Sequence, residues 1–342
     1  MKKLAPLLLA CVFFLHSPLS AGGELPWPLI IAHRGASGTL PEHTLESYAL
    51  AIEEGAHFIE PDLVSTRDGV LIARHENELS DTTDVATKFP GRQSTRTIDG
   101  REVTGWFSED FTLAEINTLR ARERLTFRDQ SNNGKFGVPT FDEVLALVRS
   151  ESAARGRDIG VYPETKHPTY FAENKLPLEP SLLASLSAYD YSSAEDWVFI
   201  QSFEVSNLKH LSEETDIRLV QLLGSASESP YDQVVARTGL TYADMIGDEG
   251  LRQISEYAIG IGPWKGLIAP QDSEGNPFPA TDLIERAHSI GLVVHAYTFR
   301  DEPRYLIKPY NADPLAEYQR FFALGVDGVF SDFPASALAA TP

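Results

Sequence analysis

The chain has 342 residues, of which 42% are hydrophobic and 23% are charged, with 24 glycines and 22 prolines. This balance is typical of a globular protein and excludes a disordered chain, a collagen and a coiled coil. Acidic residues outnumber basic residues by 49 to 29, which gives a formal net charge of −20. A surface of that sign repels nucleic acid and anionic membranes, so neither is an expected partner.

Residues 1–21 predict a secretory signal peptide rather than a part of the fold. Two lysines precede an apolar run over residues 4–15, and small residues follow as far as Ala21, which is the order of regions in such a signal. We therefore expect an exported, periplasmic protein that is cleaved near Ala21. The apolar run is too short to span a bilayer and no later stretch is long enough, so we expect no integral membrane segment.

The single cysteine, Cys11, lies inside this signal. Cleavage would leave the mature protein without cysteine, which excludes disulfides and thiolate metal sites. Residues 8–11 loosely resemble a lipoprotein cleavage box, so a lipid-anchored protein is an alternative, as is a fully secreted one. The apolar sequence after Cys11, where a polar mature tail should begin, favours simple export.

Residues 22–342 predict a single α/β domain, a (β/α)8 TIM barrel. Short apolar runs alternate with longer amphipathic stretches, which indicates parallel strands joined by crossover helices. Eight such units favour a closed barrel over a doubly wound open sheet, whose glycine-rich fingerprint is missing. The strands are expected at 29–33, 58–63, 159–164, 197–201, 217–222, 257–261, 292–297 and 327–330, and helices at 44–54, 141–149, 182–188, 280–289 and 314–324.

The first predicted strand ends at His33, and Arg34 follows it. Active sites of such barrels are built at the C-terminal ends of the strands. His33 and Arg34 are therefore candidate site residues.

The second predicted strand carries two acids on one face. Side chains alternate along a strand, so Glu60 and Asp62 would both point into the barrel. Two unpaired carboxylates there would be strongly unfavourable. A hard divalent cation is the simplest way to neutralise them.

A β-hairpin is expected directly after this strand. Asp68-Gly69 reads as a two-residue turn, and the pairing it sets would place His75 opposite Asp62 on the same face. A longer turn would shift His75 to the other face.

Residues 84–137 break the alternation and predict an insertion at one mouth of the barrel. The segment has weak periodicity and holds nine basic and eight acidic residues, so it is near neutral in an acidic protein. A loop of this length is often a lid or a binding element. A solvated excursion is the equally open alternative.

The third predicted strand adds a further acid. Glu164 and Lys166 share one face, so three carboxylates from two strands would form an oxygen shell for Ca2+ or Mg2+. Zn2+ is disfavoured because acids outnumber histidines and no mature cysteine remains. Gln201 and Tyr297, near the ends of later strands, are expected to line the pocket.

The remaining histidines are interpreted as structural, and His295 is expected in the core beneath Tyr297. Asp332 either orients a site residue or ends the last strand, and both interpretations stay open. The histidines in this group are His43, His57, His167, His210, His288 and His295.

Taken together, these residues resemble glycerophosphodiester phosphodiesterases, and the insertion and signal resemble the exported, periplasmic branch. The likeness spans nearly the whole mature chain, in order. It rests on His-Arg-Gly-Ala at 33–36, Pro-Glu-His-Thr at 41–44, Glu-Pro-Asp at 60–62, Thr-Arg-Asp-Gly at 66–69, His75, Glu-Thr-Lys at 164–166, Gln-Ser-Phe at 201–203, Tyr-Ala-Ile-Gly-Ile-Gly at 257–262, His-Ala-Tyr-Thr at 295–298 and Ser-Asp-Phe-Pro at 331–334.

The resemblance implies a TIM barrel that uses a divalent cation, with Ca2+ favoured over Mg2+, on a small glycerophosphodiester. Its implied roles are metal binding by Glu60, Asp62 and Glu164, acid–base catalysis by His33 and His75, and phosphate binding by Arg34 and Lys166. The chain departs from the family pattern at His43, commonly Asn, at Glu76, commonly Asp, and at Tyr297, often Trp. These departures leave the substrate pocket less defined than the chemistry.

The implied reaction yields sn-glycerol 3-phosphate and an alcohol. We expect His75 to act as the acid and His33 as the base, while cationic groups absorb the charge on the phosphoryl oxygens. Water and the neighbouring glycerol hydroxyl are both open as the nucleophile. A phospholipase C- or D-like lipid phosphodiesterase and an exported, non-catalytic binding protein are the alternative functions.

Overall fold

The computed structural model describes residues 25–308, 310 and 312–342. The predicted signal peptide, its cleavage site and Cys11 lie outside the described residues. Among the helices in the described ranges, none combines the length and the apolar character that a bilayer crossing requires.

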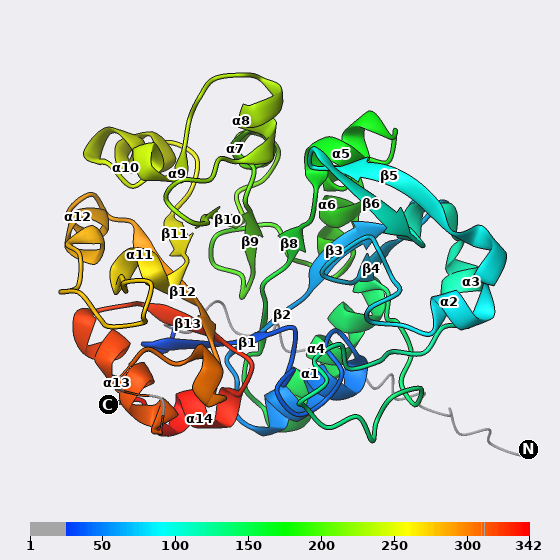
Figure 1. The fold of residues 1–342 in the computed structure, drawn as a ribbon, viewed down its shortest axis with the longest axis horizontal. Helices are drawn as coiled ribbons and strands as arrows, with labels where there is room; N and C mark the ends of the chain where they lie inside the picture. Colours follow the sequence, from blue (N-terminus) through cyan, green and yellow to red (C-terminus); the bar gives the residue numbers. More distant parts are fainter. Residues whose placement is uncertain (1–24, 309, 311) are drawn as a thin grey trace, which may run out of the picture.

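Eight parallel strand positions close into a barrel (Figure 1). The described residues form thirteen strands, because two barrel positions are each divided into two strands and three strands (β4, β5 and β6) lie outside the barrel. They are β1 (Leu29–His33), β2 (Phe58–Glu60), β3 (Asp62–Ser65), β4 (Leu71–Ala73), β5 (Ser94–Ile98), β6 (Arg101–Gly105), β7 (Gly160–Val161), β8 (Glu164–Thr165), β9 (Phe199–Ser202), β10 (Arg218–Leu223), β11 (Gly260–Pro263), β12 (Val293–Phe299) and β13 (Gly328–Ser331). Neighbours pair from β8 through β9, β10, β11, β12 and β13 to β1, and β1 pairs with β2. The predicted TIM barrel is confirmed.

Two prolines divide the strands that carry the acids. Pro61 separates β2 from β3, and Pro163 separates β7 from β8, because proline has no N–H to give to a sheet ladder. Both halves still pair in parallel, β2 with β7 and β3 with β8. They therefore form the second and third positions of the eight-stranded barrel.

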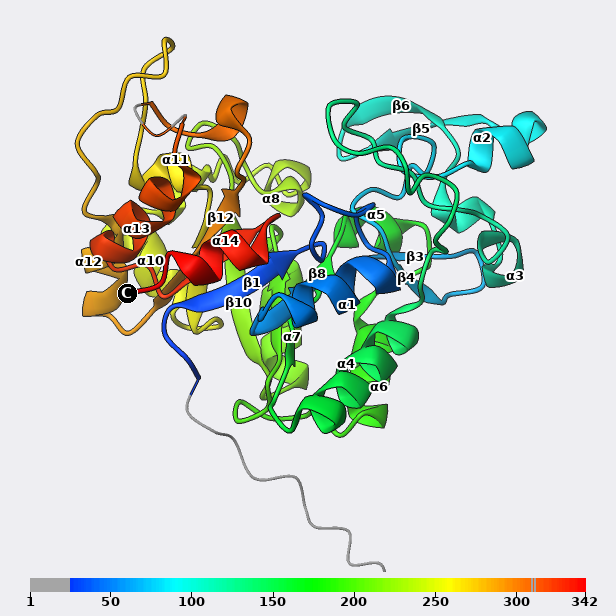
Figure 2. The ribbon, with the colours of Figure 1, turned by 90° about the horizontal axis from the view of Figure 1, so that it is seen from below.

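Helices surround the strands (Figure 2). They are α1 (Leu45–Glu53), α2 (Val85–Lys88), α3 (Leu113–Ile116), α4 (Phe141–Arg155), α5 (Pro168–Glu173), α6 (Glu179–Ala188), α7 (Val205–Glu214), α8 (Tyr231–Val235), α9 (Tyr242–Met245), α10 (Asp248–Ile254), α11 (Lys265–Ile268), α12 (Leu283–Ser289), α13 (Pro314–Leu324) and α14 (Pro334–Ala339). All eight predicted strands overlap observed ones, and the five predicted helices overlap α1, α4, α6, α12 and α13. The other nine helices in the described residues were not predicted: α2, α3, α5, α7, α8, α9, α10, α11 and α14.

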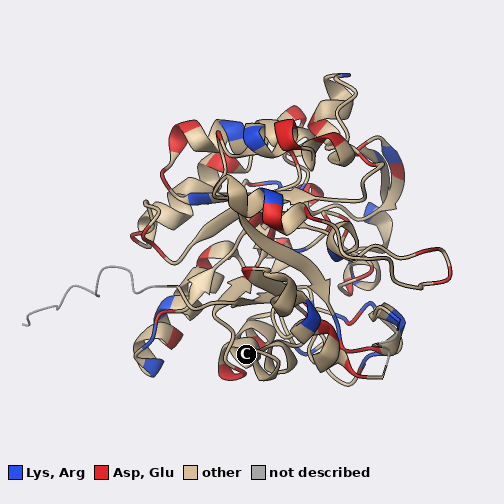
Figure 3. Cartoon of the chain, turned by 90° about the vertical axis from the view of Figure 1, so that its left-hand side faces the viewer, with Lys and Arg blue, Asp and Glu red and all other residues tan. Residues whose placement is uncertain are grey.

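Local sequence explains where the best-defined helices begin and end. Thr140 and Glu143 form a capping box at the start of α4, and Gly156 ends that helix in the left-handed conformation. The Thr44 side chain accepts the Ser47 N–H at the start of α1. Figure 3 shows most charged residues on the peripheral helices and loops rather than on the strands.

The floor of the barrel is a mainly aromatic layer. Phe58, Tyr162, Phe199 and Phe330 pack together inside it. His295 joins this layer, with its Nδ1 atom 2.9 Å from the Tyr162 hydroxyl. His295 lies in the core, as predicted, and the layer closes the barrel beneath the mouth where the strands end.

The predicted two-residue turn of the hairpin is wrong. In β3 and β4, Leu63 pairs with Ala73 and Ser65 with Leu71, so three residues separate Thr66 from Val70. The reason is local: the Thr66 hydroxyl accepts the Val70 N–H at 3.0 Å, and Gly69 adopts a left-handed φ of 80°.

Because of this register, Asp62 lies opposite Arg74 rather than His75. The Arg74 N–H donates to the Asp62 carbonyl oxygen at 2.8 Å. Strand β4 has already ended at Ala73, so strand alternation no longer decides the direction of His75.

The segment predicted as an insertion contains its own small sheet. Strands β5 and β6 form an antiparallel hairpin, and its turn residues, Asp99 and Gly100, both have positive φ. Figure 2 shows this hairpin with α2 and α3 on the side of the molecule that carries β3 and β4. The sequence analysis missed the hairpin, although Asp-Gly between alternating residues is a strong signal for one.

Candidate active site

A cavity of about 80 Å³ lies at the C-terminal ends of the barrel strands. Seven of the nine predicted site residues line it: His33, Arg34, Glu60, His75, Glu164, Gln201 and Tyr297. Of the other two, Asp62 lies fully buried among the acids. Lys166 contacts Glu164 and lines a second, neighbouring cavity.

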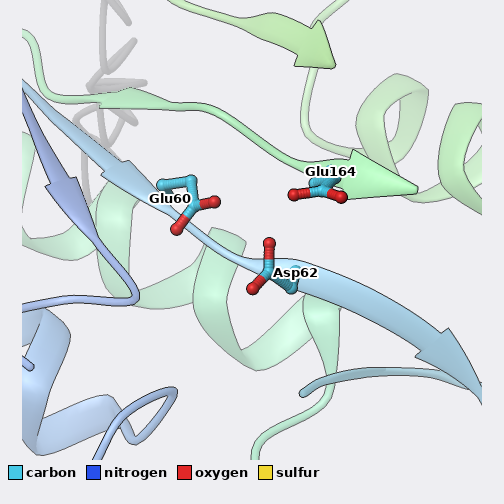
Figure 4. Close-up of side chains that lie close together, drawn as sticks. All are labelled: Glu60, Asp62 and Glu164. Atoms are coloured by element: carbon cyan, nitrogen blue, oxygen red, sulfur yellow. The ribbon is translucent and has the colours of Figure 1, made fainter. Parts of the chain in front are cut away.

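Three buried carboxylates converge beside this cavity (Figure 4). Glu60 ends β2, Asp62 begins β3 and Glu164 begins β8, and one oxygen from each lies within 4.8 Å of the others. Burial, together with the charge of Asp62, raises the pKa of Glu60 well above its usual range. Burial also raises the pKa of Glu164 to about 8, against the attraction of Lys166. Three carboxylates this close are not stable together as anions without a cation.

The donors present fit a hard divalent cation. The set consists of oxygens alone, as Ca2+ and Mg2+ prefer. Asp62 Oδ1 is buried and has no hydrogen-bond partner among the described residues, so one oxygen of the group remains available to a ligand. These three residues could hold a metal.

The other oxygen of Asp62 is held by two basic groups. His43 Nε2 lies 2.9 Å and Arg34 Nε 3.3 Å from Asp62 Oδ2. Burial opposes ionisation, but these neighbours keep the pKa of Asp62 well below its usual range. His43, interpreted as structural, thus contacts a candidate metal ligand, and its Nδ1 atom lies 2.7 Å from the Tyr48 hydroxyl.

Arg34 joins several parts of the site. Its backbone has a positive φ of 61°, and its N–H donates to Glu60 Oε2 at 2.7 Å. Its guanidinium contacts Glu42 at 3.3 Å in addition to Asp62. Glu42 was not predicted as a site residue, although it stands inside the Pro-Glu-His-Thr motif.

His33 ends β1 with its ring against a carboxylate. Its Nδ1 atom lies 2.6 Å from Asp332 Oδ1, which leaves Nε2 as the nitrogen available to a molecule in the cavity. Burial, and then the charge of Arg34, lowers the pKa of His33 to about 4. The imidazole is therefore neutral at pH 7, the state that accepts a proton.

His75 has a similar partner but a more open position. Its Nδ1 atom lies 2.8 Å from Glu76 Oε1, and its Nε2 lies 3.3 Å from Lys166 Nζ. Desolvation, followed by Arg34 and Lys166, lowers the pKa of His75 to about 3. Two neutral imidazoles thus border one cavity.

The remaining predicted residues complete the walls. Lys166 Nζ lies 3.0 Å from Glu164 Oε1. Gln201 Nε2 donates to Glu60 Oε1 at 3.1 Å, while the Tyr297 hydroxyl donates to the Leu223 carbonyl at 2.9 Å. Gln201 therefore fixes a candidate metal ligand, and Tyr297 forms part of the wall.

A larger cavity of about 890 Å³ adjoins the small one. Both are lined by Glu164 and Phe203. The wall of the larger cavity also includes Asp99 from the β5–β6 turn, His167 and Tyr242. A molecule too long for the small cavity would extend into this space.

Comparisons with known proteins agree with this geometry. Residues 33–336 match the glycerophosphoryl diester phosphodiesterase family. The chain is 42% identical to the glycerophosphodiester phosphodiesterase GDPD6 of Arabidopsis thaliana, covering 90% of this chain and 84% of that protein. It is 32% identical to the glycerophosphodiester phosphodiesterase of Haemophilus influenzae, covering 90% and 87%.

Among solved structures, two similar ones cover almost the whole chain. A glycerophosphoryl diester phosphodiesterase structure from Silicibacter pomeroyi has a TM-score of 0.66 at 22% identity, covering 93% of this chain and 94% of that one. A phosphodiesterase from Oleispira antarctica, solved with the product sn-glycerol-3-phosphate, has a TM-score of 0.59 at 20% identity, covering 92% and 96%. At these identities the likeness concerns the fold.

Proposed function

The chain belongs to the glycerophosphoryl diester phosphodiesterase family, and on this premise we propose that it hydrolyses glycerophosphodiesters to sn-glycerol 3-phosphate and an alcohol. The observation that carries the proposal is the single cavity bordered by His33, His75 and the carboxylates of Glu60 and Glu164. The relatives at 42% and 32% identity bear the name of this activity. The Oleispira protein, with the same fold, binds the product that this reaction would give.

Glu60, Asp62 and Glu164 would hold a divalent cation, and we favour Ca2+ over Mg2+. Ca2+ tolerates an irregular set of carboxylates, whereas Mg2+ demands near-octahedral geometry. A bound cation would supply Lewis-acid stabilisation of the phosphoryl oxygens.

His33 would act as the base and His75 as the acid. Asp332 at 2.6 Å from His33 Nδ1 favours a proton on that nitrogen and a free lone pair on Nε2. Desolvation is the main cause of the low pKa of His75, and the charges of Arg34 and Lys166 lower it further. An anionic phosphodiester in the cavity would offset these two charges. Each role would contribute roughly 10²- to 10⁴-fold to the rate.

Arg34 and Lys166 would bind the phosphate oxygens as their donors turn from Glu42 and Glu164 toward the substrate. Planar guanidinium suits two oxygens at once, while the lysine acts as a point charge. Gln201 and Tyr297 would bound the small cavity, with the alcohol extending into the larger one. Water and the neighbouring glycerol hydroxyl both suit this arrangement as nucleophile.

Export to the periplasm belongs to the same proposal. The pattern of residues 1–21 supports it. Mass spectrometry of the N-terminus after expression would test cleavage near Ala21 and lipidation at Cys11 together.

The decisive experiment measures glycerol 3-phosphate released from glycerophosphocholine by the purified protein. We expect release with Ca2+ or Mg2+, loss in EDTA, and a drop of at least about 10²-fold in His33→Ala. His210→Ala is the matched control, since that histidine is exposed on α7. No release under any divalent ion would refute the proposal, and turnover of lysophosphatidylcholine alone would favour a lipid phosphodiesterase.

A further inference from the structure

Both candidate catalytic histidines are connected to residues 84–137 through a carboxylate. We propose that this segment braces the two imidazoles, with Arg128 and Asp99 as positioning residues that act through Asp332 and Glu76. The inference rests on the proposed function, because it concerns the same acid–base pair. It assigns a role to a segment whose sequence alone indicated either a lid or a solvated excursion.

The first connection runs from Arg128 to His33. Arg128 Nη2 donates to Asp332 Oδ2 at 2.6 Å, and the other oxygen of Asp332 lies 2.6 Å from His33 Nδ1. Arg128 is itself fixed, with its side chain 5% exposed and its Nη1 donating to the Ser37 carbonyl at 2.8 Å. Arg128 therefore fixes the carboxylate behind His33 together with Arg300, whose Nε donates to the same oxygen at 2.9 Å.

The second connection runs from Asp99 to His75. Asp99, in the β5–β6 turn, places Oδ2 2.6 Å from His167 Nδ1. His167 Nε2 lies 3.1 Å from Glu76 Oε2, and the other oxygen of Glu76 lies 2.8 Å from His75 Nδ1. His167 precedes α5 as its N-cap residue with a positive φ of 50°, a conformation that surrounding contacts must hold in a residue other than glycine.

The two connections have the same arrangement of contacts, although their residues come from distant parts of the chain. In each, a carboxylate gives one oxygen to a catalytic imidazole and the other to a basic group tied to residues 84–137. A carboxylate at Nδ1 fixes the tautomer and the ring orientation of a histidine. Fixing its second oxygen stops the carboxylate from rotating away.

Simple docking of the segment onto the barrel is the competing explanation. Docking needs ion pairs, but it does not need the carboxylates that contact the two histidines. The segment has other attachments for that purpose, such as Arg124 with Glu42 at 2.8 Å. That both connections end on the histidines favours positioning over docking.

The test compares Arg128→Gln and Asp99→Asn in the full-length protein with glycerophosphocholine as substrate. We expect kcat to fall about 10- to 100-fold in Arg128→Gln, the range for partners behind a catalytic group, and severalfold in Asp99→Asn, which acts on His75 only through His167 and Glu76. We expect KM to stay within about twofold, because neither side chain lines the small cavity. Arg120→Gln and Asp129→Asn are matched controls inside the same segment, since the hydrogen bonds of both side chains are local. We expect the controls to retain wild-type kcat.

A second readout separates positioning from loss of structure. Imidazole nitrogen NMR should show altered tautomer populations of His33 in Arg128→Gln and of His75 in Asp99→Asn, with the other histidine unchanged. Asp99 lies in a turn with 30% of its side chain exposed, so Asp99→Asn keeps the test available if Arg128→Gln does not fold. If Asp99→Asn keeps the wild-type kcat, or only its KM rises, the proposed positioning role of residues 84–137 is wrong.

The outcome also distinguishes this inference from the function on which it rests. An inactive wild-type protein refutes the phosphodiesterase proposal and, with it, the positioning role of residues 84–137. If the wild type is active but the Arg128→Gln and Asp99→Asn variants match the controls, only the positioning role of residues 84–137 is refuted.

Discussion

The surroundings of His33 and His75 differ in burial and in the groups that hold them. His33 ends a barrel strand, and its partner Asp332 is 2% exposed and contacts two arginines, Arg128 and Arg300. His75 follows a short hairpin strand, and the side chain of its partner Glu76 is 50% exposed. His33 is thus held by fixed charges inside the protein, whereas His75 is held at the rim.

This difference suits two different tasks in the phosphodiesterase reaction. Guanidinium groups stay protonated at every relevant pH, so the contacts that fix Asp332, and through it His33, do not change with pH. Glu76 instead depends on His167, an imidazole that gains and loses its proton. We infer that the protein fixes one of the two proposed catalytic imidazoles rigidly and leaves the other adjustable beside the larger cavity.

The largest effect is expected from removing Asp332, the buried partner of His33. Asp332→Asn should lower kcat about 10²- to 10⁴-fold, because the amide favours the wrong tautomer of a ring for which the described residues offer no other hydrogen-bond partner. Steady-state kinetics on glycerophosphocholine would measure the loss, with KM nearly unchanged. A decrease smaller than that of Glu76→Gln would contradict the assignment of His33 as the more tightly held of the two.

The carboxylates between the two histidines offer a test that does not depend on turnover. A divalent ion at 100 times its Kd should stabilise the fold by about 2.7 kcal/mol, since it binds the folded state alone. Thermal unfolding with Ca2+, Mg2+ or EDTA would measure this. Asp62→Asn should abolish the response and Asp129→Asn should preserve it, while equal melting temperatures with and without ions would exclude the metal site.

A smaller effect is expected at the rim. Glu76→Gln should lower kcat only about tenfold, because exposed charge pairs are weak and Lys166 still contacts His75 Nε2. Glu78→Gln is less suitable as a control, since its carboxylate accepts backbone N–H groups. Glu46→Gln, on the exposed face of α1, is the better match, and a kcat equal to that of Glu46→Gln would show that Glu76 does not orient His75.

The sequence predicted what depends on local patterns. Apolar runs located the barrel strands, and the alternation of Glu60 with Asp62 located the acids. His75 was found for the wrong reason, because its position follows from the end of β4 and not from the register of a two-residue turn. A one-residue error in a turn reverses the face of every later side chain in the strand.

The connections behind the histidines could not be predicted in this way. Arg128 and Asp332 are 204 positions apart, and His33 and Asp332 are 299 apart, so no periodicity relates them. Asp332 was left open between orienting a site residue and ending the last strand, and His167 was interpreted as a structural histidine. Asp99-Gly100 did carry a local signal, and reading it as a hairpin would have placed a rigid element in the segment 84–137.

The smallest expected effect is a dependence of the rim on pH. Burial would lower the pKa of His167, and Lys166 also lowers it, but Asp99 and Glu76 together raise it to about 9. A raised folded-state pKa gives stability that is present below about 6.5, the ordinary value, and is lost as the pH rises through 9. The contact between His167 Nε2 and Glu76 Oε2, which fixes Glu76, should weaken over the same pH range.

We therefore expect kcat of the wild type to fall severalfold as the pH passes 9, with a matching decrease in melting temperature. In Asp99→Asn the pKa of His167 should fall toward its ordinary value, so the same decline should begin about two units lower. Both proteins contain Glu164 and the other titrating groups of the site. The difference between the two pH profiles therefore reports the contribution of His167. If the two profiles coincide, the protonation of His167 does not affect the orientation of Glu76 and His75. The difference between His33 and His75 would then rest on burial alone.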